Sequence, residues 1–279
     1  MYLSIKKKDS VTSILLFIFN IFLVNQGITS VPLKKIFRML EPFQKNETAI
    51  RMGLSRGVQN GLLVNEKQIN EVYYRITDEA VRGVKHWQET LAIFRARIPI
   101  QLSGWDGKFS ILFIESAGEK RGIEAFTESL RKIGYGSLSN TFWISPYDLP
   151  GKVEELAHKH KAENFYQFRG GLSVNRKPFE IAKNAWPIIS LAERYSLFEK
   201  SMKEAASGLD ADSYDGGGGL PFLHLHGLEL FNIIQDDPQL PLNLLPPDWP
   251  GLQAAKAFLD IREQILPKAN EYISRILSE

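Results

Sequence analysis

The chain of 279 residues contains no cysteine, only four methionines and no long uninterrupted apolar run. Without cysteine, the protein has no disulfide framework, no thiolate nucleophile and no cysteine-ligated zinc. A membrane-spanning helix needs about 20 apolar residues, whereas Asn20 interrupts the longest apolar stretch, residues 14–24. A strong net charge is also missing, because 34 Lys and Arg face 32 Asp and Glu. These absences argue against a disulfide scaffold, a cysteine-dependent enzyme and a span at this stretch.

The composition is that of a globular protein, with 44% apolar and 24% charged residues. At about 100–200 residues per domain, the length predicts two or three compact units. Basic residues outnumber acidic ones before residue 90, whereas the rest of the chain is slightly acidic. This asymmetry favours a polyanion partner for the N-terminal region, although ordinary surfaces carry a similar excess.

The first 27 residues allow two interpretations. Lys6, Lys7 and Lys8 precede the apolar stretch, as the basic segment of a secretory signal does. Residues 24–27 match the small residues of a cleavage site poorly, so a buried helix is favoured. The alternative is a secreted or membrane-anchored binding protein.

Residues 10–95 predict three helices, a hairpin and a fourth helix. Ser10 and Gly27 are suited to begin and end the first helix. The second is expected to open at residues 30–32 and to close at Pro42. Asn46 is a favourable N-cap for the third, and Gly61 is suited to end it. Ile50, Leu54 and Val58 then share one face of the third helix, with Arg51, Ser55 and Gln59 on another.

Two β-prone segments follow, residues 62–64 and 72–76, joined by a polar loop at 65–70. Residues 77–79 are suited to cap the next helix. Three helices followed by a two-stranded wing is the order of a winged helix-turn-helix. In that fold the third helix enters the major groove and the hairpin touches the DNA backbone.

A boundary near Ile98 and Pro99 separates a second pattern, which alternates strands with helices. Strands are expected at 109–115, 141–145 and 164–168, with helices at 119–133 and 150–161. This order predicts a ferredoxin-like sheet with helices on one face. From Phe179 onward only helices are expected, at 179–206, 222–234 and 251–277.

The sequence therefore predicts a multidomain α+β protein. Residues 1–97 are expected to form a winged-helix DNA-binding domain, and residues 98–175 a ferredoxin-like central α/β sandwich for dimerisation or spacing. Residues 176–279 are expected to form an α-helical effector-binding domain.

Three strings of residues carry a resemblance to a known family. Residues 47–56 read Glu-Thr-Ala-Ile-Arg-Met-Gly-Leu-Ser-Arg. Trp105-Asp106-Gly107 is followed by Phe-Trp-Ile-Ser-Pro at 142–146. Residues 237–241 read Asp-Pro-Gln-Leu-Pro, and 244–251 read Leu-Leu-Pro-Pro-Asp-Trp-Pro-Gly. These strings resemble the PaaX-like regulators, the repressor family of the phenylacetate degradation operon.

The resemblance implies a cytoplasmic, homodimeric transcriptional regulator that binds a double-stranded DNA operator. It implies repression of a catabolic operon of the phenylacetate or aromatic-acid type. An acyl-CoA effector would release the DNA, and this is phenylacetyl-CoA in the best-known members. Gly53 and Gly57 stand where better helix formers are expected in the third helix, at a cost of about 0.5–1 kcal/mol each. Weaker or more adaptable DNA contact is the expected result.

DNA contacts are predicted on the third helix and the wing. Arg51 can donate two hydrogen bonds to guanine, and Ser55 can bond base or phosphate. Lys45 and Asn46 stand where a helix N-terminus attracts phosphate. The alternative for each is a solvated surface side chain. The predicted DNA-binding residues are Lys45, Asn46, Thr48, Arg51, Ser55, Arg56, Lys67 and Gln68.

Aromatic residues suggest where an effector could bind. A pocket between the second and third domains is one interpretation, since ligand pockets are frequent at domain interfaces. Ordinary core packing is the alternative. The effector-binding residues predicted are Trp143, Trp186, Arg194, Tyr195 and Trp249.

No metal ion, cofactor or catalytic residue is predicted, and the protein is expected not to be an enzyme. Glu154 and His158 share a helical face, but His160 points elsewhere, so a metal site is disfavoured. His224 and His226 are expected to precede a helix as satisfied or surface residues. Glu115 ends a strand where related CRISPR-associated nucleases carry a metal-binding Asp. A metal-dependent nuclease on the central domain is therefore the alternative function.

Overall fold

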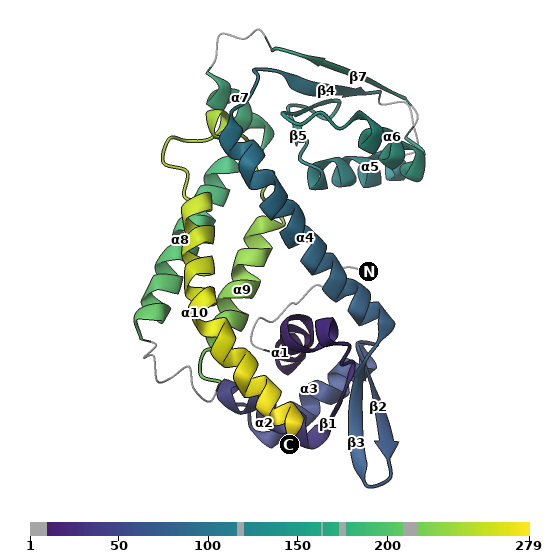
Figure 1. Cartoon of the computed structure of the whole chain (residues 1–279). Helices are drawn as coiled ribbons and strands as arrows, with labels where there is room; N and C mark the ends of the chain where they lie inside the picture. The colour runs from purple at the N-terminus through teal and green to yellow at the C-terminus, as the bar shows by residue number, and fades with distance from the viewer. Residues whose placement is uncertain (1–9, 116–119, 163, 173–176, 209–216) are drawn as a thin grey trace. The chain divides into compact units, whose positions relative to one another are not determined.

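The computed structural model describes residues 10–115, 120–162, 164–172, 177–208 and 217–279 (Figure 1). Helices and two small antiparallel sheets make up the chain, which confirms the α+β prediction. The residues divide into two compact units, 1–91 with 198–231 and 253–279, and 92–197 with 232–252. Segments far apart in sequence thus contribute to each unit. The division into domains 1–97, 98–175 and 176–279 stays a prediction.

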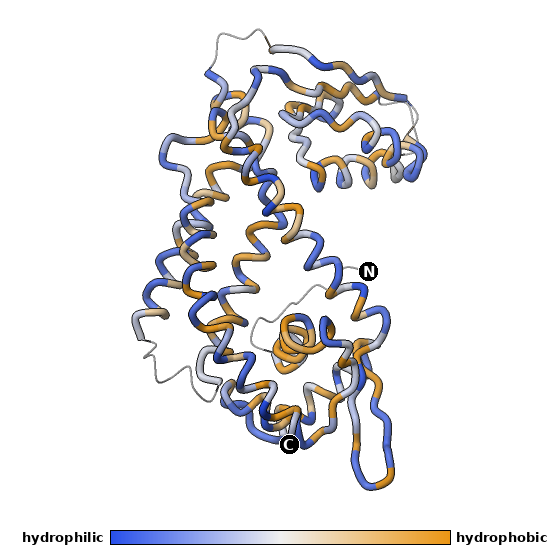
Figure 2. The backbone as a smooth tube through the Cα atoms, viewed as in Figure 1, coloured by the Kyte–Doolittle hydropathy of each residue, from blue (hydrophilic) through white to orange (hydrophobic). Residues whose placement is uncertain are grey.

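The apolar N-terminal stretch is buried in the first unit. Helix α1 (Val11–Ile18) begins at Ser10, whose hydroxyl accepts a hydrogen bond from the Ser13 amide at 3.2 Å. It continues as a π-helix, η1 (Phe19–Leu23), and a 3-10 turn, η2 (Val24–Gln26), that ends at left-handed Gly27. Figure 2 shows apolar residues along this segment. In the described part of the chain, no helix has the length and apolar character to cross a membrane.

A short strand stands where the second helix was expected to open. Residues Ser30–Pro32 form β1, which pairs with β3 through Ser30↔Arg75 and Pro32↔Tyr73. Helix α2 (Leu33–Leu40) begins only after Pro32, and the 3-10 turn η3 (Glu41–Phe43) follows it. Proline lacks an N–H group, so it is tolerated at an edge strand and directly before a helix. The expected start at Ser30 was therefore wrong by three residues.

The third helix and the hairpin follow. Asn46 caps α3 (Glu47–Gln59) by accepting from the Ala49 amide at 2.8 Å, as predicted. Strands β2 (Leu63–Gln68) and β3 (Glu71–Ile76) pair along their whole length, and the sheet order is β1-β3-β2. Only Ile69 and Asn70 make the turn, so the predicted loop at 65–70 was too long. Pairing with β3 extends β2 through polar residues that its apolar pattern does not include.

Helix α4 (Asp78–Ser103) passes straight through the expected boundary at Pro99. Thr77 caps it, accepting from the Ala80 amide at 3.2 Å. Proline inside a helix removes one backbone hydrogen bond. Contacts beyond Pro99 hold the last turn, because buried Gln101 donates to the Leu240 carbonyl at 2.8 Å. The helix ends at Gly104, which has a positive φ.

The second unit contains a four-stranded antiparallel sheet in the order β5-β6-β4-β7. The strands are β4 (Phe109–Ile114), β5 (Gly136–Ser137), β6 (Phe142–Ser145) and β7 (Phe165–Gly170). Helices α5 (Lys120–Lys132) and α6 (Pro150–His160) lie on the same side of it (Figure 1). Between helices and sheet is a core that includes Leu112, Ile114, Phe126, Leu130, Trp143 and Val153. Two-residue β5 is too short to have given a sequence pattern.

The remaining helices agree with the predicted all-helical region. They are α7 (Pro178–Ala185), α8 (Ile188–Ser207), α9 (Leu220–Ile234) and α10 (Gly251–Ser278), with the 3-10 turn η5 (Leu242–Leu244). The expected helix at 179–206 is broken at Trp186 and Pro187, because a proline disfavours helical backbone in the residue before it.

Candidate nucleic-acid interface

Helix α3 presents one buried and one exposed face. Ile50 and Leu54 are buried, and Val58 is half-buried. The exposed face carries five of the predicted DNA-binding residues: Asn46, Thr48, Arg51, Ser55 and Arg56. The 3.6-residue period of the sequence therefore separates packing residues from residues that are free to meet a partner.

Two glycines let neighbouring elements approach the buried face of α3. A Cβ added at Gly53 would lie 2.4 Å from the Cβ of Val11 in α1. A Cβ added at Gly57 would lie 2.8 Å from Cδ1 of Leu63 in β2. The sequence suggested only that these residues weaken the helix. Their packing role could not be read from the sequence, because the neighbours lie in other elements.

Arg51 is held from two sides. Its Nε and Nη2 donate to Oε1 of Glu47 at 2.9 and 2.6 Å. Its guanidinium also lies over the ring of Phe37 in α2, 5.2 Å from the ring centre. Both partners were missed by sequence reasoning. The i,i+4 spacing of Glu47 and Arg51 was the signal that could have found the first.

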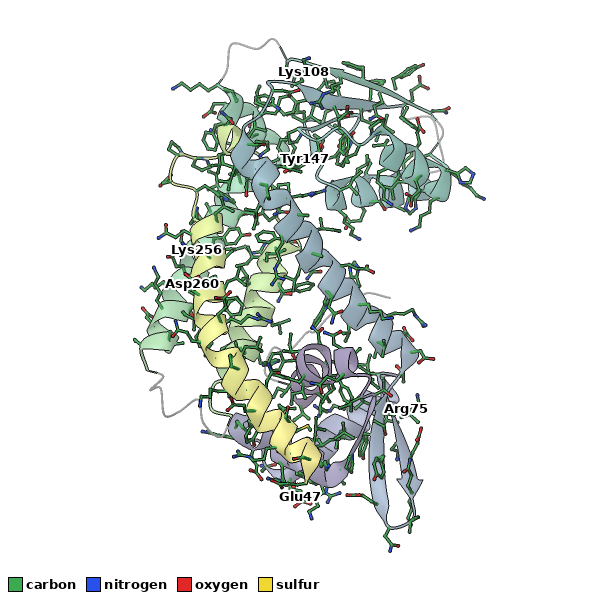
Figure 3. The ribbon with its side chains drawn as sticks, in the orientation of Figure 1. Glu47, Arg75, Lys108, Tyr147, Lys256 and Asp260 are labelled. Atoms are coloured by element: carbon green, nitrogen blue, oxygen red, sulfur yellow. The ribbon has the colours of Figure 1, made fainter. Side chains whose placement is uncertain are left out.

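The other predicted DNA contacts lie directly before α3 and on the hairpin. Lys45 is half-buried directly before the cap of α3. Lys67 and Gln68 are exposed, but they belong to the end of β2 rather than to a loop. Arg75, labelled on the hairpin in Figure 3, pairs with Glu66 at 2.9 Å. Arg75 on the wing is thus already paired with Glu66, whereas Lys67 is an exposed residue near the end of β2.

The C-terminal helix α10 contacts helix α2 near the start of the chain. The Lys35 ammonium of α2 donates to the Leu277 carbonyl at 2.6 Å, and Arg38 pairs with Glu279. The Tyr272 hydroxyl donates to the Arg38 carbonyl at 2.6 Å. The end of α10 is therefore fastened to α2.

Helix α9 adds a second attachment. His224 Nε2 and the Ser13 hydroxyl lie 2.9 Å apart, and its ring contacts Phe17 and Phe43. His224 and His226 lie inside α9, within the helix expected at 222–234, so they do not precede it. Both are buried. Helix α9 begins at Leu220, two residues before the expected start.

Two of the predicted effector residues lie in packed cores. Trp143 is buried between the central sheet and its helices, where its Nε1 donates to the Asn140 carbonyl at 3.3 Å. Trp186 is buried against β5, and a Cβ added at Gly136 would lie 2.4 Å from its ring. Both tryptophans therefore contribute to packing in the second unit.

Of the other three predicted effector residues, Arg194 and Tyr195 contact the segment at 236–250, and Trp249 belongs to that segment. Tyr195 packs edge-on against Trp249, with ring centres 5.7 Å apart. Its hydroxyl donates to Asp237 at 2.7 Å, and Arg194 pairs with Asp236 at 2.7 Å. Burial raises the pKa of Tyr195, and the Asp237 carboxylate adds to the shift.

Asp237 is the centre of a larger buried cluster. Asp237 as a whole keeps some exposed surface, but protein atoms surround its carboxylate. This burial raises the pKa of the Asp237 carboxyl group. Its Oδ1 accepts from the Gln239 amide at 2.7 Å. Burial lowers the pKa of Arg97, which lies over the Tyr147 ring with 4.9 Å between the guanidinium carbon and the ring centre. Burial raises the pKa of Tyr147 to about 12.

Three stretches of the chain match known protein families. Residues 11–80 match the PaaX-like protein family, 102–180 match the PaaX protein central Cas2-like domain, and 186–275 match the PaaX-like protein C-terminal domain. The chain belongs to the PaaX-like family. It is 25% identical over 247 residues to the transcriptional repressor PaaX of Escherichia coli (strain K12), covering 85% of this chain and 74% of that protein.

A solved structure also shares the PaaX-like fold of this chain. It is an uncharacterized protein from Mycobacterium tuberculosis, 19% identical, with a TM-score of 0.62. The likeness covers 94% of this chain and 99% of that one. All eight predicted DNA-binding residues fall in the first matched PaaX-like region, at 11–80.

The alternative function, a metal-dependent nuclease, was predicted on the central domain, which matches the Cas2-like domain of PaaX proteins. Among the residues with described placement, no three His, Asp or Glu side chains come together to hold a metal ion. Glu115 follows β4 and hydrogen-bonds Tyr166, which raises the pKa of that tyrosine. His160 Nε2 lies 2.9 Å from the Ser129 hydroxyl. Residues 116–118 lie outside the described chain.

Proposed function

We propose that this PaaX-like protein is a ligand-responsive, DNA-binding transcriptional regulator. In this proposal it represses a catabolic operon of the phenylacetate or aromatic-acid type, in the cytoplasm, and an acyl-CoA releases it from DNA. The observation that carries the proposal is the exposed polar face of α3, with Arg51 at its centre, in the region that matches the PaaX-like family.

The arrangement of the first unit supports a winged helix-turn-helix. Three helices precede a hairpin, and β1 adds a third strand to it, so α3 is the element we assign to the major groove. In the central domain, the order β5-β6-β4-β7 with two helices on one side supports a ferredoxin-like fold. A homodimer would place two α3 helices about 34 Å apart on a pseudo-palindromic operator.

An effector is assigned to the second unit. Trp143, Trp186, Arg194, Tyr195 and Trp249 remain the proposed effector-binding residues. Of these, Arg194 keeps an exposed side-chain fraction of 38%, so it is the one best placed to meet an anionic group. Effector binding can release DNA only if the ligand prefers the arrangement of the protein that does not bind DNA.

The test is fluorescence anisotropy of purified protein on a labelled duplex from upstream of its own gene. A scrambled duplex and a salt series are the controls. Specific binding with a steep salt dependence, lost on titration with phenylacetyl-CoA, is the expected result. Equal, weak binding to both duplexes would reject the regulator. Specific binding that no acyl-CoA thioester weakens would reject only the effector.

A further inference from the structure

The arginine that we assign to base reading is restrained before any DNA arrives. Glu47 and Arg51 are both exposed, with side-chain exposed fractions of 64% and 55%. An exposed arginine on a helix normally samples many rotamers. Here the Glu47 carboxylate holds one edge of the guanidinium, and the guanidinium carbon lies over the Phe37 ring.

The geometry points to Glu47 as a specificity-determining residue that acts by positioning Arg51. This inference rests on the proposed function, and it names how that DNA-reading surface discriminates between sequences. Glu47 is a positioning residue here, since its carboxylate acts through the guanidinium rather than on a base.

The hydrogen-bond inventory of Arg51 leaves one edge for DNA. A guanidinium has five N–H donors in a planar fork. Glu47 takes the Nε and Nη2 edge, whereas no described residue accepts a hydrogen bond from Nη1. The remaining edge, Nη1 with the second Nη2 hydrogen, can donate to O6 and N7 of guanine. The pair thus fixes both the edge that is offered and its direction.

Phe37 makes the restraint two-sided. It belongs to α2, a different helix from the one that carries Arg51. The face of an aromatic ring attracts a guanidinium and so favours positions above that ring. A guanidinium held by a carboxylate and a ring loses less conformational freedom when it meets a base. Base recognition is therefore pre-organised in the free protein.

The charge of Glu47 adds discrimination against other DNA. Its carboxylate neutralises Arg51 and stands near the phosphates that α3 would approach, so it weakens attraction to any duplex. A correct base pair offsets this loss with directed hydrogen bonds, but an incorrect one does not. Removing the charge should strengthen general binding and reduce the preference for the operator.

The experiment has two parts and four variants of the full chain. Selection from a random duplex pool first defines the sequence that the wild-type protein prefers. Anisotropy then measures binding to that duplex and to a scrambled one, for Glu47→Gln, Arg51→Ala and the double variant. Glu89→Gln is the matched control, because Glu89 is an exposed acid on α4 and its change removes the same charge. Thermal unfolding confirms that all variants fold.

We expect Glu47→Gln to bind the scrambled duplex more tightly and to steepen its salt dependence by about one unit of slope. The ratio of scrambled to preferred dissociation constants should fall about tenfold. Glu89→Gln should leave this ratio unchanged. In the Arg51→Ala background, Glu47→Gln should no longer alter the ratio, because the glutamate acts through that arginine.

Three results would overturn the inference, and they are distinguishable. A wild-type protein that selects no sequence rejects the proposed function together with the inference. A wild-type protein that selects a sequence, with an unchanged ratio in Glu47→Gln, rejects the inference alone. An effect of Glu47→Gln that persists without Arg51 would make Glu47 a direct reader and reject its positioning role.

Discussion

Two arginine–carboxylate clusters in this chain have opposite surroundings. On α3, Arg51 and Glu47 are both more than half exposed, and Phe37 is their only aromatic partner among the residues described. Around Asp237, the carboxylate is surrounded by Tyr195 and the Gln239 amide, with Arg97 nearby. Water screens the first cluster and is largely excluded from the second. The exposed pair is therefore suited to a partner, and the buried cluster to holding the fold.

The buried cluster should give the largest loss of stability. Asp237→Ala leaves the Tyr195 hydroxyl and the Gln239 amide without their acceptor, and it removes a counter-charge from Arg97. We expect the free energy of unfolding to fall by about 3 kcal/mol. Denaturant unfolding measures it. A loss below about 0.5 kcal/mol would show that the cluster does not stabilise the fold.

Asp237→Asn is the matched control for charge. Burial raises the pKa of Asp237 in the folded state, so folding disfavours its ionised form. The contribution of this group to stability is therefore greatest below the ordinary pKa of 3.8 and declines as pH rises through the raised folded value. Asparagine cannot ionise, so the variant should lose this decline. Identical pH dependence in both proteins would contradict the assigned shift.

Substitutions on the buried face of α3 should give the next largest loss of stability. Gly53→Ala places a Cβ 2.4 Å from that of Val11, at the base of a branched side chain that cannot turn away. We expect a loss of about 2 kcal/mol in stability. Gly57→Ala should cost less, because its contact is the flexible end of Leu63. Thermal unfolding of both variants measures these losses, with a substitution at an exposed residue, Ser55→Ala, as the control. Equal stability in all three variants would refute this order.

These glycines mark the limit of what the sequence predicts. Local patterns gave the caps at Ser10 and Asn46, the two faces of α3 and most elements, because each depends on neighbours within a few residues. The contacts of Gly53 and Gly57, the pairing of β1 with β3 and the attachment of Tyr272 to Arg38 join distant segments. No local pattern carries that information. Helix α4 similarly passes Pro99 because a distant carbonyl holds Gln101.

On the exposed side of α3, the expected loss is in binding rather than in stability. Arg51→Ala should weaken operator binding by about 1–3 kcal/mol and relax selection at one base pair. The free energy of unfolding of this variant should change by less than about 0.5 kcal/mol, since an exposed ion pair contributes little to stability. Anisotropy and thermal unfolding on the same sample test both parts. A stability loss as large as that of Asp237→Ala would erase the contrast between the two clusters.

A substitution on the wing should give the smallest effect, and this effect should be on general affinity for DNA rather than on sequence preference. Lys67 is exposed at the end of β2, and we assign it to a phosphate rather than to a base. Lys67→Ala should weaken binding to the operator and to the scrambled duplex by the same factor. It should also reduce the slope of the logarithm of affinity against the logarithm of salt concentration by about 0.9, which is the contribution of one phosphate contact. The anisotropy salt series measures both. A loss confined to the operator would make Lys67 a sequence reader, and discrimination would then extend beyond α3 to the hairpin.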